Sequence, residues 1–204
     1  MKVAGCSGRV TICRSVALMC VSLAVVLLSV AKTRAQNGSI FVTTTPSGAG
    51  VWLDNVYAGQ TTPATLTDIA PGSHFIDVIL AGYEWQGTGT GVTDGGQTTV
   101  DLKLRPFWHE AVDLGSGWKW SGWLGYFAEF GNGWIYHLQH SFMYCTGPST
   151  DSVLFWTSDM GWLWSSAGIY PNIYRFQDGA WLWYQLGSSP RWFYNYTSAQ
   201  WEMR

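Results

Sequence analysis

The side chains in this sequence that could do chemistry are mainly aromatic rings. Residues 105–204 hold 12 of the 14 Trp, 8 of the 10 Tyr and 7 of the 9 Phe. A flat ring can cover the apolar face of a sugar while nearby amides and carboxylates bind its hydroxyl groups, and Trp and Tyr can also enclose a quaternary ammonium group. The same rings can instead pack against one another in a core. Because bulky rings fall on both faces of the predicted strands, we expect part of the aromatic surface to stay exposed as an interface.

Six tryptophans from the apolar runs of this region are the candidate ligand-binding residues. They are Trp134, Trp162, Trp164, Trp181, Trp183 and Trp192. The expected partner is a glycan or a cell-wall polymer. The alternative is self-association, in which the aromatic faces of several copies of the chain pair with one another.

Residues with the spacing of a catalytic or metal centre are not evident. The sequence shows no nucleophile elbow with a Ser-His-Asp order, no Gly-rich phosphate loop before a helix and no recognisable pair of glycosidase acids. His137 and His140 form an H-x-x-H pattern, with Glu129 as the nearest acid upstream. On a hairpin this spacing does not place two imidazoles on one face, so we predict turn residues. We therefore expect a protein that is not an enzyme and has no metal or cofactor.

Charge is distributed unevenly along the chain. The first 35 residues contain five Lys or Arg and no acid, whereas residues 36–204 contain 6 basic and 13 acidic residues. An acidic mature protein argues against nucleic acid and anionic membranes as partners, because few cations remain to neutralise phosphates. The aromatic half carries 5 basic and 7 acidic residues. Its near-neutrality favours an uncharged or cationic polymer as the partner.

The N-terminal segment, residues 1–35, resembles a secretory signal peptide. Three basic residues precede an uncharged apolar run at 15–31, and Thr33-Arg34-Ala35 forms a tolerable cleavage site. An uncleaved signal anchor is the alternative, because the apolar run approaches the length of a membrane span. Either interpretation exports the remaining chain to the periplasm, the cell surface or the medium. Cys145 is the only cysteine after this segment, and we expect it to be a buried small side chain.

Residues 38–104 read as six or seven short strands separated by turn residues, which predicts a small β-sandwich. Four turn motifs occur in order: VTTTPSGAGVWLDN at 42–55, GQTTP at 59–63, IAPGSH at 69–74 and AGY at 81–83. Together they resemble a PEGA domain. The resemblance implies a small β-sandwich of exported bacterial and archaeal surface proteins, with no catalytic residues. The match departs from the family at the turn that gives it its name, where Ala70 and Ser73 flank Pro71-Gly72.

After a linker at 105–113, residues 114–204 show an internal repeat of 19–20 residues. One series of positions runs through Leu114, Trp134, Leu154, Ile173 and Trp192, and a second runs through Trp123, Phe142, Trp162, Trp181 and Trp201. We predict about five stacked aromatic β-hairpins, of which the first is degenerate. In aromatic density and period they are loosely similar to the hairpin repeats of cell-wall-binding and choline-binding modules. The regular motif spacing of those modules is missing, so no ligand residues carry over.

The predicted fold class is therefore all-β: a signal helix, a PEGA-like sandwich and a series of aromatic hairpins. The predicted function is that of an exported, non-catalytic envelope or surface protein, with no nucleic-acid partner and no membrane contact beyond an N-terminal anchor.

Overall fold

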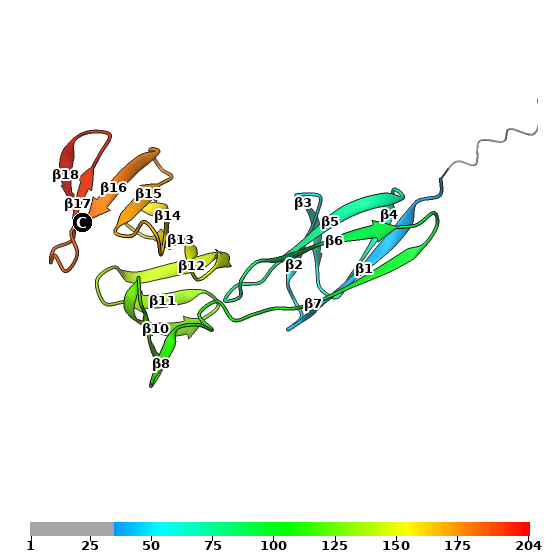
Figure 1. Cartoon of the computed structure of the whole chain (residues 1–204), viewed down its shortest axis with the longest axis horizontal. Coiled ribbons are helices and arrows are strands. Elements are labelled where there is room, and N and C mark those ends of the chain that lie inside the picture. The colour runs from blue at the N-terminus through cyan, green and yellow to red at the C-terminus, as the bar shows by residue number, and fades with distance from the viewer. Residues whose placement is uncertain (1–34) are drawn as a thin grey trace, which may run out of the picture. The chain divides into compact units, whose positions relative to one another are not determined.

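The computed structural model describes residues 35–204, and this part of the chain contains 18 strands and no helix (Figure 1). The all-β prediction is thus confirmed. The predicted signal helix lies outside the described residues. Residues 36–204 form one compact unit. Within residues 35–204 no helix is long and apolar enough to cross a membrane.

Residues 38–103 form two sheets. The three-stranded sheet has the order β4-β1-β7, with β1 (Gly38–Thr45), β4 (Ala64–Ile69) and β7 (Gln97–Lys103). The four-stranded sheet has the order β3-β2-β5-β6, with β2 (Gly50–Leu53), β3 (Val56–Thr61), β5 (Gly72–Ile79) and β6 (Gln86–Val92). The pair β1–β7 is parallel and the other pairs are antiparallel.

The core between these sheets comes from alternate residues of their strands. Ile40 and Val42 of β1, Val51 of β2, and Ile76 and Val78 of β5 are fully buried in one cluster. Period-two burial of this kind is expected where one face of each strand is covered and the other is wet. The predicted sandwich is therefore present, with seven strands.

Residues 112–203 form a second architecture, an antiparallel sheet of 11 strands in sequence order. The strands are β8 (Val112–Gly115), β9 (Trp118–Ser121), β10 (Gly125–Gly131), β11 (Trp134–His137), β12 (Ser141–Ser149), β13 (Ser152–Thr157), β14 (Gly161–Ser166), β15 (Asn172–Arg175), β16 (Ala180–Tyr184), β17 (Trp192–Asn195) and β18 (Gln200–Met203). Every strand pairs with its neighbours in the chain, so the sheet is a continuous series of hairpins.

The predicted repeat falls on these hairpins, with one error. The four later pairs of repeat positions lie on β11–β12, β13–β14, β15–β16 and β17–β18. The first predicted pair is wrong, because Leu114 lies on β8 and Trp123 lies in the turn after β9. The structure instead forms the first equivalent hairpin from β9 and β10. Trp123 was misassigned because its indole N–H donates to the Thr150 carbonyl at 3.0 Å and holds the turn rather than a strand position.

The 11-stranded sheet buries one face by curling onto itself. Residues of this inward row, including Phe127, Met143, Phe155, Leu163 and Phe193, are at most 2 % exposed. The His140 ring, in the turn before β12, lies 4.5 Å from the ring of Tyr184 on β16. Strands four positions apart would be about 19 Å from each other in a flat sheet. The inward row therefore packs against itself, and Figure 1 shows the strand direction changing progressively from β10 to β18.

Residues Phe107 and Trp108 belong to this same core. Both lie in the predicted linker, and both are at most 2 % exposed within the cluster under the 11-stranded sheet. The segment that enters the sheet is therefore packed rather than extended in solvent.

A buried polar side chain ends the first strand of each of the last four hairpins. These side chains are His137, Thr157, Arg175 and Asn195. His137 Nδ1 accepts hydrogen bonds from the amides of Gln139 and His140, and Asn195 Oδ1 accepts from those of Thr197 and Ser198. His137 and Asn195 thus satisfy backbone donors that their turns leave unpaired, whereas Arg175 donates to carboxylates and Thr157 Oγ1 has no hydrogen-bond partner among the described residues.

Arg175 organises the last two turns through two carboxylates. Its guanidinium donates to Asp178 Oδ1 and Oδ2 at 2.9 and 2.6 Å and to Glu202 Oε2 and Oε1 at 2.7 and 3.0 Å. The hydrogen bond from Arg175 lowers the pKa of Glu202 to about 2. Asn195 Nδ2 also donates to Glu202, at 2.7 Å. This network joins β15, β17 and β18 on the inward side of the sheet.

We predict that Glu202→Gln destabilises the chain by about 2 kcal/mol, because a buried guanidinium loses half of its paired charge. The free energy of unfolding in urea measures this change. Asp113→Asn is the matched control, since the amide oxygen can still accept the hydrogen bond from Gly115 N. Equal stability of the two variants would show that the network contributes nothing.

His137 and His140, at the turn between β11 and β12, predict a pH dependence of stability. Burial lowers the pKa of His137 and lowers the pKa of His140 well below its ordinary value, and the charge of Arg191 acts in the same direction on both. Tyr170 and Tyr184 are the other titratable groups around His140. Since the unfolded chain takes up protons below about pH 6.5 and the folded chain resists them, stability should be complete above that pH and fall as the pH drops.

The variant His137→Asn should weaken this dependence while keeping the turn, because Asn195 makes the same turn contacts in the last hairpin. Each titrating group accounts for at most about 1.4 kcal/mol per pH unit. Urea unfolding at pH 7.5, 6.5 and 5.5 gives the slope of the unfolding free energy against pH for the wild type and for the variant. Comparing wild type with variant cancels His74, whose pKa is raised by its hydrogen bond to Asp54 and whose contribution has the opposite sign. Parallel curves would contradict the assignment.

Candidate functional site

The six predicted tryptophans all lie on the outward face of the 11-stranded sheet. Trp134, Trp162 and Trp181 are exposed, by 39, 42 and 39 %, and Trp164, Trp183 and Trp192 are half-buried. Of the 12 Trp in residues 105–204, Trp108 alone is buried. The alternative that these rings pack in a core therefore fails for Trp. Phe, Met, Leu and Ile fill the core, and the larger rings point outward.

The outward rings follow the hairpin repeat. In each hairpin, the two outward residues nearest the turn, here called turn-proximal, lie directly opposite each other on the two strands. The five pairs are Trp120/Tyr126, Tyr136/Phe142, Trp156/Trp162, Tyr174/Trp181 and Tyr194/Trp201. Ring centroids are 5.1 Å apart in Tyr136/Phe142, 5.4 Å in Tyr174/Trp181 and 5.5 Å in Tyr194/Trp201. Directly opposed aromatic pairs of this kind stabilise antiparallel sheets.

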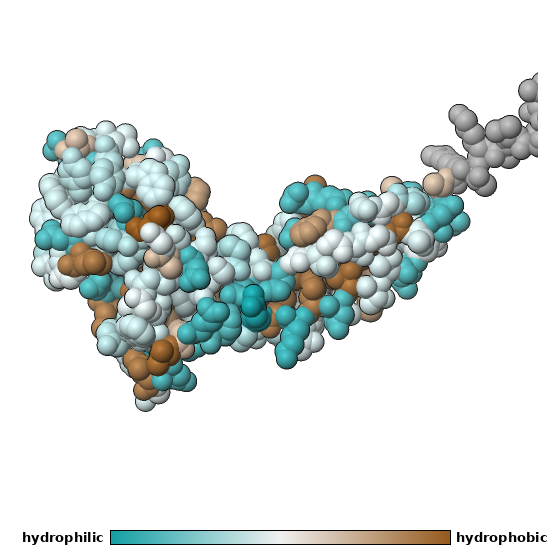
Figure 2. Space-filling view, viewed as in Figure 1, coloured by the Kyte–Doolittle hydropathy of each residue, from teal (hydrophilic) through white to brown (hydrophobic). Residues whose placement is uncertain are grey.

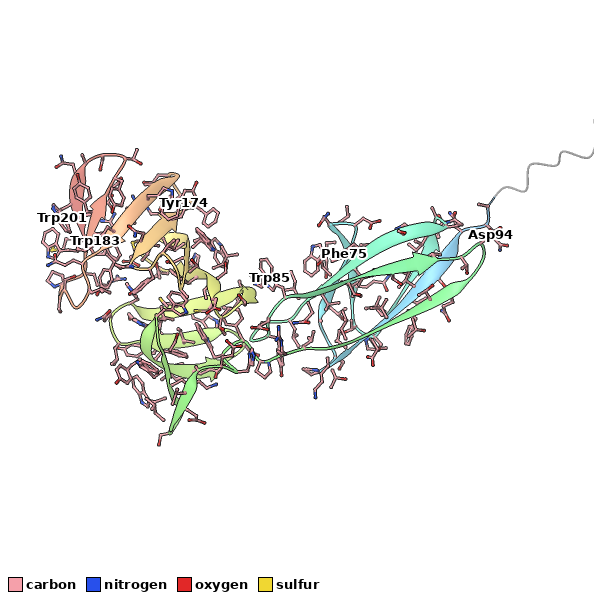
Figure 3. All side chains as sticks on the ribbon, in the orientation of Figure 1. Phe75, Trp85, Asp94, Tyr174, Trp183 and Trp201 are labelled. Carbon is pink, nitrogen blue, oxygen red and sulfur yellow. The ribbon has the colours of Figure 1, made fainter. Side chains whose placement is uncertain are left out.

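Adjacent hairpins are joined by a second set of ring contacts. On the second strand of a hairpin, a further ring lies two residues after the turn-proximal ring. This further ring contacts the turn-proximal ring of the next hairpin, as in Tyr144/Trp162, Trp164/Trp181 and Trp183/Trp201. Their centroid separations are 6.1, 6.0 and 6.0 Å, all edge to face. Figure 3 labels Tyr174, Trp183 and Trp201 among these rings. The outward face is thus an aromatic ladder whose later hairpins are joined by ring contacts, so the rings in contact lose little freedom on binding.

No outward position of strands β9–β18 carries a charged residue. The charged side chains of these strands, such as Lys119, Glu129, Arg175 and Glu202, occupy the inward row and form ion pairs. Figure 2 shows this region as mainly pale, the colour of residues such as Trp and Tyr near the middle of the hydropathy scale. The ladder therefore offers large flat rings without an electrostatic preference for either sign.

Two recesses in the outward face have equivalent positions in successive hairpins. The first includes Trp162 and Phe176, and the second includes Trp181 and Tyr196. Each pair combines the turn-proximal ring of one hairpin with the ring of the first turn residue of the next hairpin. The same backbone hydrogen bond joins them, from Phe176 N to Trp162 O and from Tyr196 N to Trp181 O, both at 3.0 Å. The two recesses are therefore copies of one structural unit.

The first recess is walled entirely by carbon. Leu154, Thr146 and Trp85 complete its lining around Trp162 and Phe176, and its exposed lining contains no polar surface. Trp85 comes from the segment between β5 and β6, and it is fixed there because its indole N–H donates to Thr146 Oγ1 at 2.9 Å and its amide to Gly147 O at 3.1 Å. Figure 3 labels this ring. The volume of this recess, about 420 Å³, would admit a small apolar group.

The second recess is similar in size but has polar groups. Asn172 stands where Leu154 stands in the first recess, and Ile169 completes the lining with Trp181 and Tyr196. The Tyr196 hydroxyl donates to Asn172 Oδ1 at 3.2 Å, and Asn172 Nδ2 donates to Ile169 O at 3.0 Å. The phenol oxygen and the second amide proton of Asn172 remain available to a ligand. This recess can therefore combine stacking on a ring with hydrogen bonds.

A third recess lies at the start of the sheet and is different in kind. It is lined by Trp120 and Trp123 together with the acids Glu110 and Asp151. Glu110 Oε2 already accepts a hydrogen bond from Thr150 Oγ1 at 3.2 Å. Since it lacks the ring arrangement of the other two, it is not a member of the repeated set.

The histidine pair and the cysteine serve the fold. His137 Nε2 donates to the Leu124 carbonyl at 2.7 Å, so both ring nitrogens are engaged, and His140 Nε2 lies 3.0 Å from the Tyr170 hydroxyl. Cys145 is fully buried, and burial raises the pKa of its thiol well above the ordinary value. Among residues 35–204, no group of three or more His, Cys, Asp or Glu side chains is placed to hold a metal ion.

Several ladder rings were missed in the sequence. Trp156, Tyr174, Tyr194 and Trp201 occupy the turn-proximal outward positions but were not among the six candidates. Strict alternation counted outward from each turn would have identified them, because every second residue of a strand shares a face. A choice by apolar motif alone overlooks the tyrosines together with Trp156 and Trp201.

Comparison with known proteins identifies the first sandwich. No curated protein matches the chain. The family model of the PEGA domain matches residues 37–107, which confirms the prediction for residues 38–104. PEGA domains are non-catalytic, surface-associated units that are typical of exported proteins. The PEGA family model thus matches the two-sheet part of the chain, and the aromatic sheet follows the matched residues.

Proposed function

We propose that this is an exported, non-catalytic envelope or surface protein whose aromatic ladder binds an uncharged glycan or cell-wall polymer. The observation that carries the proposal is the ladder itself: a continuous row of half-exposed rings on strands β9–β18 with no charged residue among them. The PEGA domain supports an exported location and acts as the spacer or docking unit in this proposal.

Burial energetics explain why such a surface requires a partner. Exposed aromatic rings in a continuous patch are costly in water, and soluble monomers rarely expose large apolar patches without using them. Ten large aromatic side chains on the outward row of the sheet or its turns are exposed, among them Tyr126, Phe142, Trp162, Trp181 and Trp201. A sugar chain can cover such rings with the apolar faces of its pyranoses and keep its hydroxyl groups in water.

Self-association is the second candidate, and the sheet edges favour it. Within the described residues, β8 and β18 are each paired on one side only. Trp201 and Met203 of β18 are about half exposed, as are Val112 and Leu114 of β8. An unpaired edge strand can accept a strand from another copy. Sedimentation across a hundredfold range of protein concentration distinguishes this candidate, because it requires oligomers that grow with concentration.

We predict that Trp181→Ala reduces binding to insoluble cell-wall polysaccharides by about tenfold or more, because truncating a central aromatic contact removes a binding hot spot. The fold should survive, since this ring is 39 % exposed and its neighbours pack around it. Pull-down on a panel of wall polymers, followed by intrinsic Trp fluorescence, measures the change.

Two controls make this result interpretable. Phe75→Ala removes an exposed ring on β5, outside the ladder, and should preserve the binding. Trp108→Ala opens the core and should cost about 3–5 kcal/mol of stability. Unchanged pull-down by Trp181→Ala, in a variant with wild-type circular dichroism, would refute the role of the ladder.

We also predict that binding changes less than about twofold between 50 and 500 mM NaCl, because screening acts on charge pairs and the ladder has none. The same pull-down measures this insensitivity. A steep loss of binding with salt would indicate that charged turn residues, rather than the rings, contact the polymer.

A further inference from the structure

We propose that the two repeated recesses select a linear polymer of acetamido sugars, with an acetamido methyl group in the Trp162/Phe176 recess and a pyranose ring on Trp181. This inference rests on the proposed function and adds to it a polymer class and an assignment of subsites. The recesses are equivalent in backbone geometry but differ in chemistry, and the difference determines which polymer fits.

The spacing of the recesses comes from the hairpin repeat. Equivalent positions in successive hairpins are two strands apart, which is about 9.6 Å at ordinary strand spacing. This distance is long enough for two sugar rings in a chain that runs across the strands. Because Trp162 and Trp181 are equivalent residues in the two units, one chain can reach both of them with alternate sugars.

The chemistry of the first recess favours a methyl group. Three rings, from Trp85, Trp162 and Phe176, together with Leu154, enclose it without exposed polar surface. A hydroxyl group placed there finds no hydrogen-bond partner on the wall in exchange for the water that the wall displaces, which is unfavourable. An acetamido methyl group gains apolar contact instead, while its amide can remain at the rim.

The chemistry of the second recess favours the sugar ring itself. Trp181 provides a flat surface, and Asn172 and Tyr196 provide a free amide proton and a phenol oxygen for sugar hydroxyl groups. A hydroxyl group is tolerated here because it finds partners. The first recess therefore selects for the acetamido group, and the second holds the chain.

Charged ligands fit neither recess. No residue lining the two recesses is charged, so neither recess offers a counter-charge to a phosphate, a uronic acid or an amine. This excludes deacetylated amino sugars along with acidic ones. The expected polymer is neutral and N-acetylated.

The test compares two hexasaccharides that differ at one substituent. The full chain is titrated by Trp fluorescence and calorimetry with hexa-N-acetylchitohexaose and with cellohexaose, which has hydroxyl groups in place of the acetamido groups. We expect the N-acetylated chain to bind at least about tenfold tighter, the discrimination that one small apolar group can provide. The corresponding disaccharide should bind more weakly than the hexasaccharide, because it cannot fill both recesses.

Variants assign the subsites. Phe176→Ser copies Ser158, which holds the equivalent position one hairpin earlier, and it should reduce the preference for the acetylated chain to less than about threefold. Trp181→Ala should weaken both hexasaccharides, and Phe75→Ala, on β5 and outside the ladder, should weaken neither. Circular dichroism and urea unfolding of each variant show whether the fold is kept.

Three outcomes would overturn the inference: equal affinity for the two hexasaccharides, binding of neither, or a preference that survives Phe176→Ser. The proposed function fails separately, because it requires only that some wall polymer be retained through Trp181. A polymer panel on which wild type binds a non-acetylated glycan and Trp181→Ala does not would therefore sustain the proposed function and refute this inference.

Discussion

A single-layer sheet can bury only one of its faces, and the aromatic half of this protein depends on how that constraint is met. The 11-stranded sheet curls until its inward row contacts itself, so that His140 and Tyr184 meet across four strands. That row is built from Phe, Met, Leu, Ile and Cys side chains, which fill a curved interior. The outward row then has nothing to pack against except its own neighbours. Trp and Tyr suit this position, because edge-to-face contacts stabilise them while leaving part of each ring exposed.

The polar turns preserve that division of faces. A shift of one residue in strand pairing would exchange the inward and outward rows, and the ladder would be lost into the core. His137, Arg175 and Asn195 oppose such a shift, because their buried side chains are satisfied only by specific atoms of their own turns or of the neighbouring hairpin. Gly179, at a φ of 69°, lets the Asp178-Gly179 turn close without the strain that a side chain would bring. The surface that we propose to bind glycan is therefore specified by residues that never contact it.

The sequence predicted most elements because turn residues and alternation are local signals. The PEGA strands and four of the five hairpins lie where Pro, Gly, Asp and the period of 19–20 residues place them. The first hairpin departs from the period because only residues 132–133 join β10 to β11, which brings Tyr126 within 16 residues of its equivalent, Phe142. The curl was not predictable in this way. It depends on contacts between strands four or more apart, and no local pattern shows that Tyr184 will meet His140.

The recesses were also beyond the reach of sequence, although their residues are simple to name afterwards. Each needs a ring at the turn-proximal position of one hairpin and a second ring entering the turn of the next. Earlier in the sheet that second position is held by Leu138 or Ser158, and after β18 no further hairpin follows within the described chain. Trp201 is the equivalent of Trp162 and Trp181, but it has a wall on one side only. The repeat therefore produces a ladder along its whole length and complete recesses only between β13 and β18. A binding site of defined length thus arises from a repeat whose units differ at single positions.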